Sequence, residues 1–148
     1  KRITPEEKNI LTDAFLENAD GIREQLSGGS GTQKNVLVLT EKLCSEEVRT
    51  RMMQDIIREY ARDARVFIKP HPMDTLDYER VFPECIVLRG RFPLEVMKYL
   101  EGVHFHRAVA ILTQAIESMD YVDEKIFLGQ AFLDAYEDPS LHAFNQVL

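Results

Sequence analysis

Residues 35–69, NVLVLTEKLCSEEVRTRMMQDIIREYARDARVFIK, hold two short apolar runs on either side of a stretch with helical periodicity. The first run, Val36 to Leu39, is apolar at every position, which is typical of a strand buried on both faces of a parallel sheet. Ser45 stands where a helix N-cap belongs. The second run, Val66 to Ile68, has the same character as the first. The order strand, helix, strand predicts a right-handed βαβ unit. The apolar face of the helix is formed by Val48, Met52, Ile56 and Tyr60.

The rest of the chain continues this alternation, which predicts an α/β fold: a Rossmann-like parallel sheet with helices on both faces. In such sheets ligands bind beyond the carboxyl ends of the strands. Further strands are predicted at 86–88, within 105–112 and at 126–128, and further helices at 93–100, 113–119, 130–136 and 140–148. The loops at the predicted binding edge are 40–47, 69–74, 89–95 and 113–117.

The chain divides into three parts by pattern. Residues 1–26 read as an N-terminal helix with Thr4 as its cap, and residues 27–34, which include SGGSGT, read as a flexible linker. Residues 35–148 form the Rossmann-like domain. Because the chain starts at Lys1 without a methionine, we expect it to be either a piece of a larger protein or a chain from which tag residues were removed.

Composition excludes several classes of protein. The 148 residues carry a net charge of −7, which disfavours a nucleic-acid surface. Cys44 and Cys85 form no CxxC pair, so a zinc site or a disulfide framework is not expected and a reducing compartment fits best. His104 and His106 share a strand face but lack a third ligand, so no metal is expected. The apolar run Ala108 to Leu112 is too short to span a bilayer. Neither GxGxxG nor GxxxxGK[ST] is present, so no dinucleotide cofactor or P-loop is expected.

The segment KPHP, Lys69 to Pro72, follows the second predicted strand. Two prolines restrict the backbone that carries His71, which suits a side chain that must meet a ligand atom. Histidine can donate a proton near neutral pH, and Lys69 adds a positive charge, so together they suit a departing phosphate. The alternative, equally open, is a rigid loop whose histidine only bonds a backbone carbonyl.

Other polar residues at the predicted edge have two interpretations each. Glu46 and Glu47 in a first helical turn favour the helix dipole, or one of them is a general base. Thr113 and Gln114 open a helix, as an ordinary cap or as an anion site. Glu95 either favours a dipole or accepts hydrogen bonds from ribose hydroxyls.

These motifs together resemble those of bacterial sialyltransferases. KPHP resembles their His-Pro motif, and the nearest likeness is to glycosyltransferase family 52, the lipooligosaccharide sialyltransferases, and to the polysialyltransferases. LVLTEKLCSEEV resembles the segment with the acidic-acidic-glycine motif, here Glu46, Glu47 and Val48. RGRFPLEVM resembles the stretch that lines the nucleotide site, AVAILTQAIES resembles the segment with paired hydroxyls near the phosphate, and KIFLG fits the closing pattern. The likeness covers about residues 35–136.

The resemblance implies a GT-B enzyme, of which this chain is the C-terminal, nucleotide-sugar-binding domain. The implied donor is CMP-sialic acid, the acceptor is a galactoside-type glycan, and neither a metal nor a cofactor is required. Glu47 would be the general base and His71 the general acid or phosphate partner, with Glu95 on ribose and Thr113 on phosphate. The other implied substrate-binding residues are Glu46, Lys69, Pro72, Arg91, Phe92 and Gln114.

The chain departs from the family pattern at Val48, which replaces glycine, at Glu47, which replaces aspartate, and at Gln114, which replaces a hydroxyl. Two alternatives therefore stay open: a transferase that uses CDP-glycerol, and a non-catalytic, degenerate Rossmann-like binding domain. Acceptor contacts are expected from an absent N-terminal half, so the chain alone is expected to be inactive. A cytoplasmic location is expected, with peripheral attachment to the inner membrane and a homodimer as open options.

Overall fold

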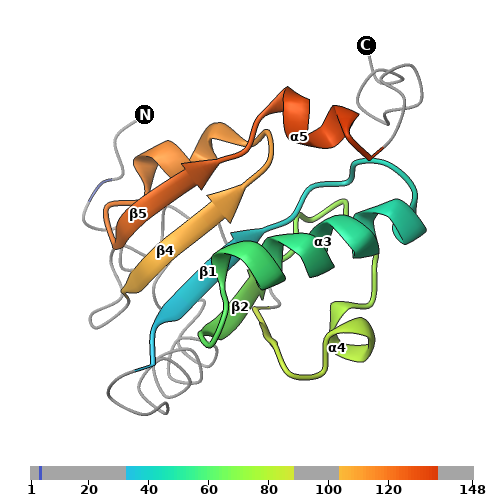
Figure 1. Ribbon diagram of the computed structural model, residues 1–148. Helices are drawn as coiled ribbons and strands as arrows, with labels where there is room; N and C mark the ends of the chain where they lie inside the picture. Colours follow the sequence, from blue (N-terminus) through green and yellow to red (C-terminus); the bar gives the residue numbers. More distant parts are fainter. Residues whose placement is uncertain (1–3, 5–32, 89–103, 137–148) are drawn as a thin grey trace.

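The computed structural model describes Thr4, residues 33–88 and residues 104–136 (Figure 1). Within these residues five strands form one sheet in the order β3-β2-β1-β4-β5, and every neighbouring pair is parallel. The predicted α/β class with a parallel sheet is therefore confirmed. The strands are β1 (Asn35–Leu39), β2 (Arg65–Lys69), β3 (Ile86–Val87), β4 (Phe105–Ala110) and β5 (Val122–Phe127).

The sheet separates two hydrophobic cores because successive side chains of a strand point to opposite faces. On one face, Val38 and Ile68 pack with Met52 and Ile56 of the helix α3 (Glu46–Tyr60). Figure 1 shows this helix lying along β1 and β2. On the other face, Leu37, Leu39 and Phe67 pack with Ile116 and Met119, which belong to and follow the 3₁₀ helix η2 (Gln114–Ser118). The apolar character of every residue from Val36 to Leu39 follows from this double burial.

Two of the predicted helices are present, and the first has a clear local cause. The Ser45 hydroxyl caps α3 by accepting a hydrogen bond from the Val48 N–H at 3.2 Å, as expected. The helix predicted at 130–136 is the shorter α5 (Gln130–Asp134).

Three elements differ from expectation. The helix predicted at 113–119 is the five-residue 3₁₀ helix η2, with Thr113 and Met119 as its caps, and its Ile116 packs into the core against distant strands. The strand β5 starts at residue 122 rather than 126, since the exposed charges of Asp123 to Lys125 on this outer strand mask it in the sequence. The short helix α4 (Tyr78–Val81) was not predicted. The predicted helices at 1–26, 93–100 and 140–148, and residues 27–32 of the predicted linker, lie outside the described residues.

The order of the strands defines where a ligand would bind. The chain runs outward from β1 through β2 to β3, and then returns to the other side of β1 as β4. The loops that follow β1 and β4 therefore start side by side and lead in opposite directions along the sheet. Open α/β sheets bind ligands at this kind of switch point.

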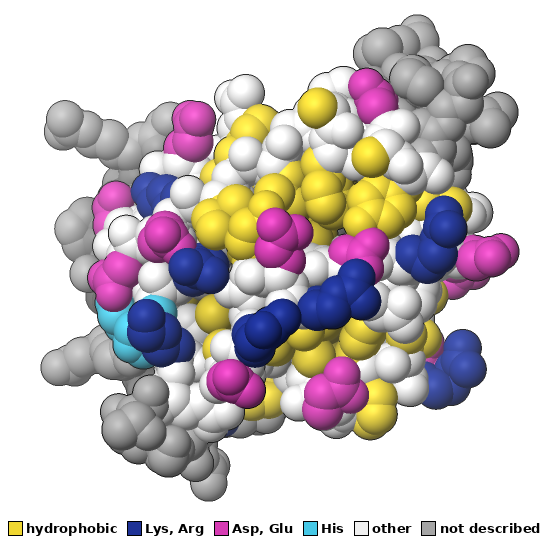
Figure 2. Space-filling view, in the orientation of Figure 1, with side chains coloured by type: hydrophobic (Ala, Val, Ile, Leu, Met, Phe, Trp, Pro, Cys, Tyr) yellow, Lys and Arg dark blue, Asp and Glu magenta, His cyan; other side chains and the backbone are white. Residues whose placement is uncertain are grey.

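Figure 2 shows the α3 side of the molecule, where acidic and basic side chains are mixed and hydrophobic side chains gather toward β5 and α5. Mixed charges do not build the positive field that nucleic acid requires, so this face offers no such surface. In the part of the chain that the structure describes, no helix combines the length and the apolar character needed to cross a bilayer.

Candidate functional site

Three loops meet at the carboxyl edge of the sheet. The Thr40 N–H donates to the Lys69 carbonyl at 3.2 Å, which extends the β1–β2 ladder by one bond. The His71 N–H donates to the Thr40 hydroxyl at 3.1 Å. On the other side of β1, the Leu112 N–H donates to the Glu41 carboxylate at 2.7 Å. The loops after β1, β2 and β4 are thus joined at the switch point.

His71 is exposed, and its ring is oriented by its own loop. The Met73 N–H donates to Nδ1 of His71 at 3.0 Å, and the Asp74 N–H donates to the His71 carbonyl at 2.9 Å. A ring nitrogen that accepts a hydrogen bond carries no proton, so the proton of the neutral ring is on Nε2. Pro70 is buried and Pro72 is exposed, which anchors the loop on one side of the histidine only. The nitrogen that can donate to a ligand is therefore Nε2.

Lys69 does not lie open beside His71. It is the last residue of β2, pairs in register with Leu39, and is only 7% exposed. Because alternate residues of a strand share a face, Lys69 lies on the same face as Phe67, away from α3. A phosphate contact from Lys69 remains a prediction that its burial does not favour.

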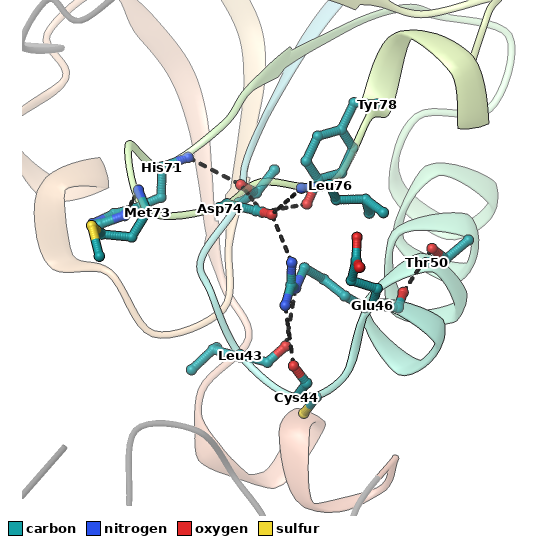
Figure 3. Close-up of polar contacts among 11 residues, drawn as sticks. Leu43, Cys44, Glu46, Thr50, His71, Met73, Asp74, Leu76 and Tyr78 are labelled. Carbon is teal, nitrogen blue, oxygen red and sulfur yellow. Dashed lines mark hydrogen bonds and ion pairs between the residues drawn. The ribbon is translucent and has the colours of Figure 1, made fainter. Parts of the chain in front are cut away.

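Asp74 is the centre of a buried polar network behind the histidine loop (Figure 3). Its carboxylate is fully buried and accepts four hydrogen bonds. Arg49 Nη1 donates at 2.7 Å and the Leu76 N–H at 3.2 Å to one oxygen. The Thr40 hydroxyl donates at 2.6 Å, and the Tyr78 hydroxyl also donates, to the other oxygen. The negative charge is thus balanced and solvated by protein groups alone.

Arg49 ties this network to the loop before α3. Its side chain is 6% exposed, and beyond Asp74 it donates from Nε to the Leu43 carbonyl and from Nη2 to the Cys44 carbonyl, each at 3.1 Å. Cys44 has φ of 63°, a left-handed conformation that costs energy for a residue with a side chain. Removing one partner of a buried ion pair typically costs about 3–5 kcal/mol. The pair therefore fixes the loop after β1 and the loop after β2 together.

Tyr78 enters the network as a neutral donor. Burial raises the pKa of its phenol, and the hydrogen bond to Asp74 raises the pKa further. The phenol therefore keeps its proton and holds the carboxylate of Asp74.

The network was not predicted from the sequence. Thr40 follows β1 directly and Asp74 lies in the loop after β2, which is the signal that could have identified them. Arg49 and Tyr78 lie in helices and have no such signal. Glu41 was also missed, although it follows β1 by two residues and lies at the switch point.

The remaining predicted residues are placed as follows. Glu46 and Glu47 are exposed in the first turn of α3, and the described hydrogen bonds of His71 lead to Thr40, Met73 and Asp74 rather than to either glutamate. The Thr113 hydroxyl caps η2 by accepting from the Ala115 N–H at 3.3 Å. Gln114 is exposed. Arg91, Phe92 and Glu95 lie outside the described residues.

A cavity of about 580 Å³ lies at the opposite edge of the sheet, where the strands begin. Lys34, His106 and Arg107 line it, and two of these three side chains already have partners in the fold. Arg107 pairs with Glu124 and donates to the Tyr60 carbonyl at 2.7 Å, and His106 Nδ1 accepts from the Asn35 N–H at 3.0 Å. Parallel sheets bind ligands at the carboxyl ends of their strands, so the His71 edge is the candidate site and this cavity is not. Among the described residues, no group of three or more His, Cys, Asp or Glu side chains is placed to hold a metal ion.

The fold and this edge define a Rossmann-like α/β domain with a histidine loop at its switch point. No protein family model matches the chain. Over 84 residues the chain is 32% identical to a protein of Haemophilus influenzae described as uncharacterized, an alignment that covers 57% of this chain and 26% of that protein.

Among solved structures, the chain is similar to an α/β-galactoside α-2,3-sialyltransferase from Photobacterium phosphoreum, with a TM-score of 0.61 and 16% identity. This match covers 84% of the chain and 35% of the sialyltransferase. At this identity the likeness shows a shared fold. The chain spans about a third of the length of the solved structure and about a quarter of the Haemophilus protein.

Proposed function

We propose that the chain is the nucleotide-sugar-binding part of a glycosyltransferase that moves sialic acid, or a related sugar, from a CMP donor to a glycan hydroxyl. The observation that carries the proposal is the exposed His71 ring, with Nε2 as its donor nitrogen, on a fixed loop at the switch point of the sheet. The sialyltransferase fold and the KPHP segment support the same reaction class.

In the proposed reaction the bond between the sugar and the CMP phosphate breaks, and the leaving phosphate gains negative charge. The Nε2–H of His71 donates to that phosphate oxygen, which stabilises the charge as it develops. Glu47 removes the proton of the acceptor hydroxyl, whose oxygen forms the new glycosidic bond. Protein side chains rather than a metal stabilise the leaving group.

The other substrate contacts belong to the same proposal. The Thr113 hydroxyl, which accepts from the Ala115 N–H, still has its own hydrogen to donate to phosphate. Glu95 contacts ribose, with Arg91, Phe92 and Gln114 along the nucleotide. In this proposal the acceptor is contacted by parts of the whole protein beyond this chain. A homodimer and attachment to the inner membrane are further properties proposed for the whole protein.

Titration with CMP, and with cytidine as the analogue that lacks phosphate, tests the proposal. A hydrogen bond to a charged group is worth about 1.5–3 kcal/mol, so His71→Ala should weaken CMP binding by about 10- to 100-fold. Cytidine binding should stay unchanged, because the histidine contacts only the phosphate. His104→Ala is the matched control, since His104 is also exposed but pairs with Asp123 at the amino edge of the sheet.

Two outcomes would redirect the proposal. If CDP-glycerol is turned over and CMP-sialic acid is not, the chain belongs to a glycerophosphotransferase instead. If neither donor nor CMP binds to the chain or to the whole protein, the domain is a non-catalytic binding unit.

A further inference from the structure

The Thr40 hydroxyl makes two hydrogen bonds with opposite roles. It accepts from the His71 backbone N–H at 3.1 Å and donates to the Asp74 carboxylate at 2.6 Å. A hydroxyl has one hydrogen, and a carboxylate can only accept, so the direction of both bonds is fixed. Thr40 is 4% exposed, so water does not substitute for either partner.

Asp74 cannot turn to release this hydroxyl. Arg49 Nη1 and the Leu76 N–H hold one of its oxygens, and the Tyr78 hydroxyl shares the other with Thr40. Arg49 is in turn held by the carbonyls of Leu43 and Cys44. The orientation of the threonine hydroxyl is therefore set by α3, by α4 and by the loop that follows β2.

We infer that Thr40 is a positioning residue for His71, locked in place by Asp74 and Arg49 through its hydroxyl. The inference rests on the proposed function, because it assigns the network to the placement of the imidazole against a phosphate. The Met73 N–H orients the ring relative to its loop, while Thr40 fixes that loop relative to the sheet. A displacement of a catalytic group by about 1 Å can cost about 100-fold in rate.

The first test measures the position of the histidine without any substrate. In the ¹⁵N-labelled protein, Thr40→Val should move the His71 amide proton upfield and shift the ring signals of His71, because the amide loses its acceptor. Thr50→Val is the matched control: it removes a hydroxyl that donates to the Glu46 carbonyl on α3, and it should leave the His71 signals unchanged. The chain has four histidines, so single variants assign each ring. Unchanged His71 signals in folded Thr40→Val would overturn the inference.

The second test is a double-mutant cycle on the transfer reaction of the whole protein. Thr40→Val should lower kcat/KM by about 10- to 100-fold, and Thr40→Ser, which keeps the hydroxyl, should restore most of the activity. In a His71→Ala background, Thr40→Val should cause no further loss, because the group that it positions is gone. Equal losses in both backgrounds would show that Thr40 supports the fold generally and would overturn the inference.

Two provisions keep the inference testable if the valine variant does not fold or the protein transfers no sugar. Thr40→Ala removes the hydroxyl without placing a methyl group where the oxygen lies, and it replaces the valine variant if that variant does not fold. The NMR measurement decides the coupling of Thr40 to His71 even if the wild-type protein transfers no sugar. A wild-type protein that transfers no sugar would overturn the proposed function and, with it, the catalytic role of the coupling between Thr40 and His71.

Discussion

One ring nitrogen of His71, Nε2, is available as a hydrogen-bond donor, because a backbone N–H occupies the other. Because Met73 N–H occupies Nδ1, only Nε2 remains to contact a phosphate. Glutamine places its amide nitrogen near the position of Nε2, whereas asparagine places its amide nitrogen near that of Nδ1. The two substitutions therefore separate the roles of the two ring nitrogens.

We expect His71→Gln to retain more CMP affinity than His71→Asn or His71→Ala, as measured by calorimetry. Transfer by His71→Gln then separates the two proposed roles of the histidine, since an amide donates a hydrogen bond but no proton. A general acid typically contributes about 10²- to 10⁴-fold, so a loss of that size with retained affinity indicates proton transfer. If His71→Asn binds CMP more tightly than His71→Gln, the assignment of Nε2 as the nitrogen that donates to phosphate is wrong.

Among the elements, α3 connects the glutamates of the candidate site with its histidine loop. Its first turn carries Glu46 and Glu47, and Arg49 in the same turn reaches back to the histidine loop. The stabilising role of the glutamates follows from the helix dipole alone. The proposed catalytic role of Glu47 needs a test that removes the charge and separates the two effects.

Glu47→Gln should destabilise the protein by about 0.3–1 kcal/mol in urea unfolding, since a negative charge near a helix N-terminus is favourable. If Glu47 is the general base, this variant should also lose transfer by about 100-fold or more. Glu59→Gln is the control, because Glu59 is exposed in the last turn of α3, where removing a negative charge is favourable. A Glu47→Gln variant that transfers sugar as well as Glu59→Gln would leave only the dipole role for Glu47.

The elements that the sequence predicts well are those with a local cause. Burial on both faces makes Val36 to Leu39 wholly apolar, and the Ser45 cap marks the start of α3. The length of β5 and the 3₁₀ geometry of η2 depend on neighbours distant in sequence, so local patterns do not show them.

For the whole molecule, the contrast between local causes and distant neighbours also separates the part of the candidate site that was predicted from the part that was missed. The parallel sheet and the rule for its carboxyl edge selected four loops, and the two prolines singled out the loop of His71 as the candidate. The network behind it joins Asp74 to Thr40 and Arg49, which lie 34 and 25 residues away in sequence. Such partners are recognisable only once β1, β2 and α3 are packed together, because each residue alone is an ordinary polar residue.

The folded molecule should lose stability at alkaline pH. Burial raises the pKa of Cys85 to about 11, with the charge of Glu84 adding to the effect. Burial also raises the pKa of Tyr136 to about 12, with a further contribution from the hydrogen bond to Asp55, and burial raises the pKa of Tyr78. In the unfolded chain, a thiol has a pKa of about 8.5 and a phenol a pKa of about 10.

Above these values the unfolded chain releases protons that the folded protein keeps, so rising pH favours unfolding. The contribution to stability is fully present below about pH 8.5 and is lost as the pH rises toward the folded pKa values. Urea midpoints should therefore fall between pH 8 and pH 10.5. The decline begins with the thiol, so Cys85→Ala should reduce the loss below pH 9.5, and Tyr136→Phe should reduce it only at higher pH. A midpoint that stays constant to pH 10.5 would mean that these groups ionise as readily in the folded protein as in the unfolded chain.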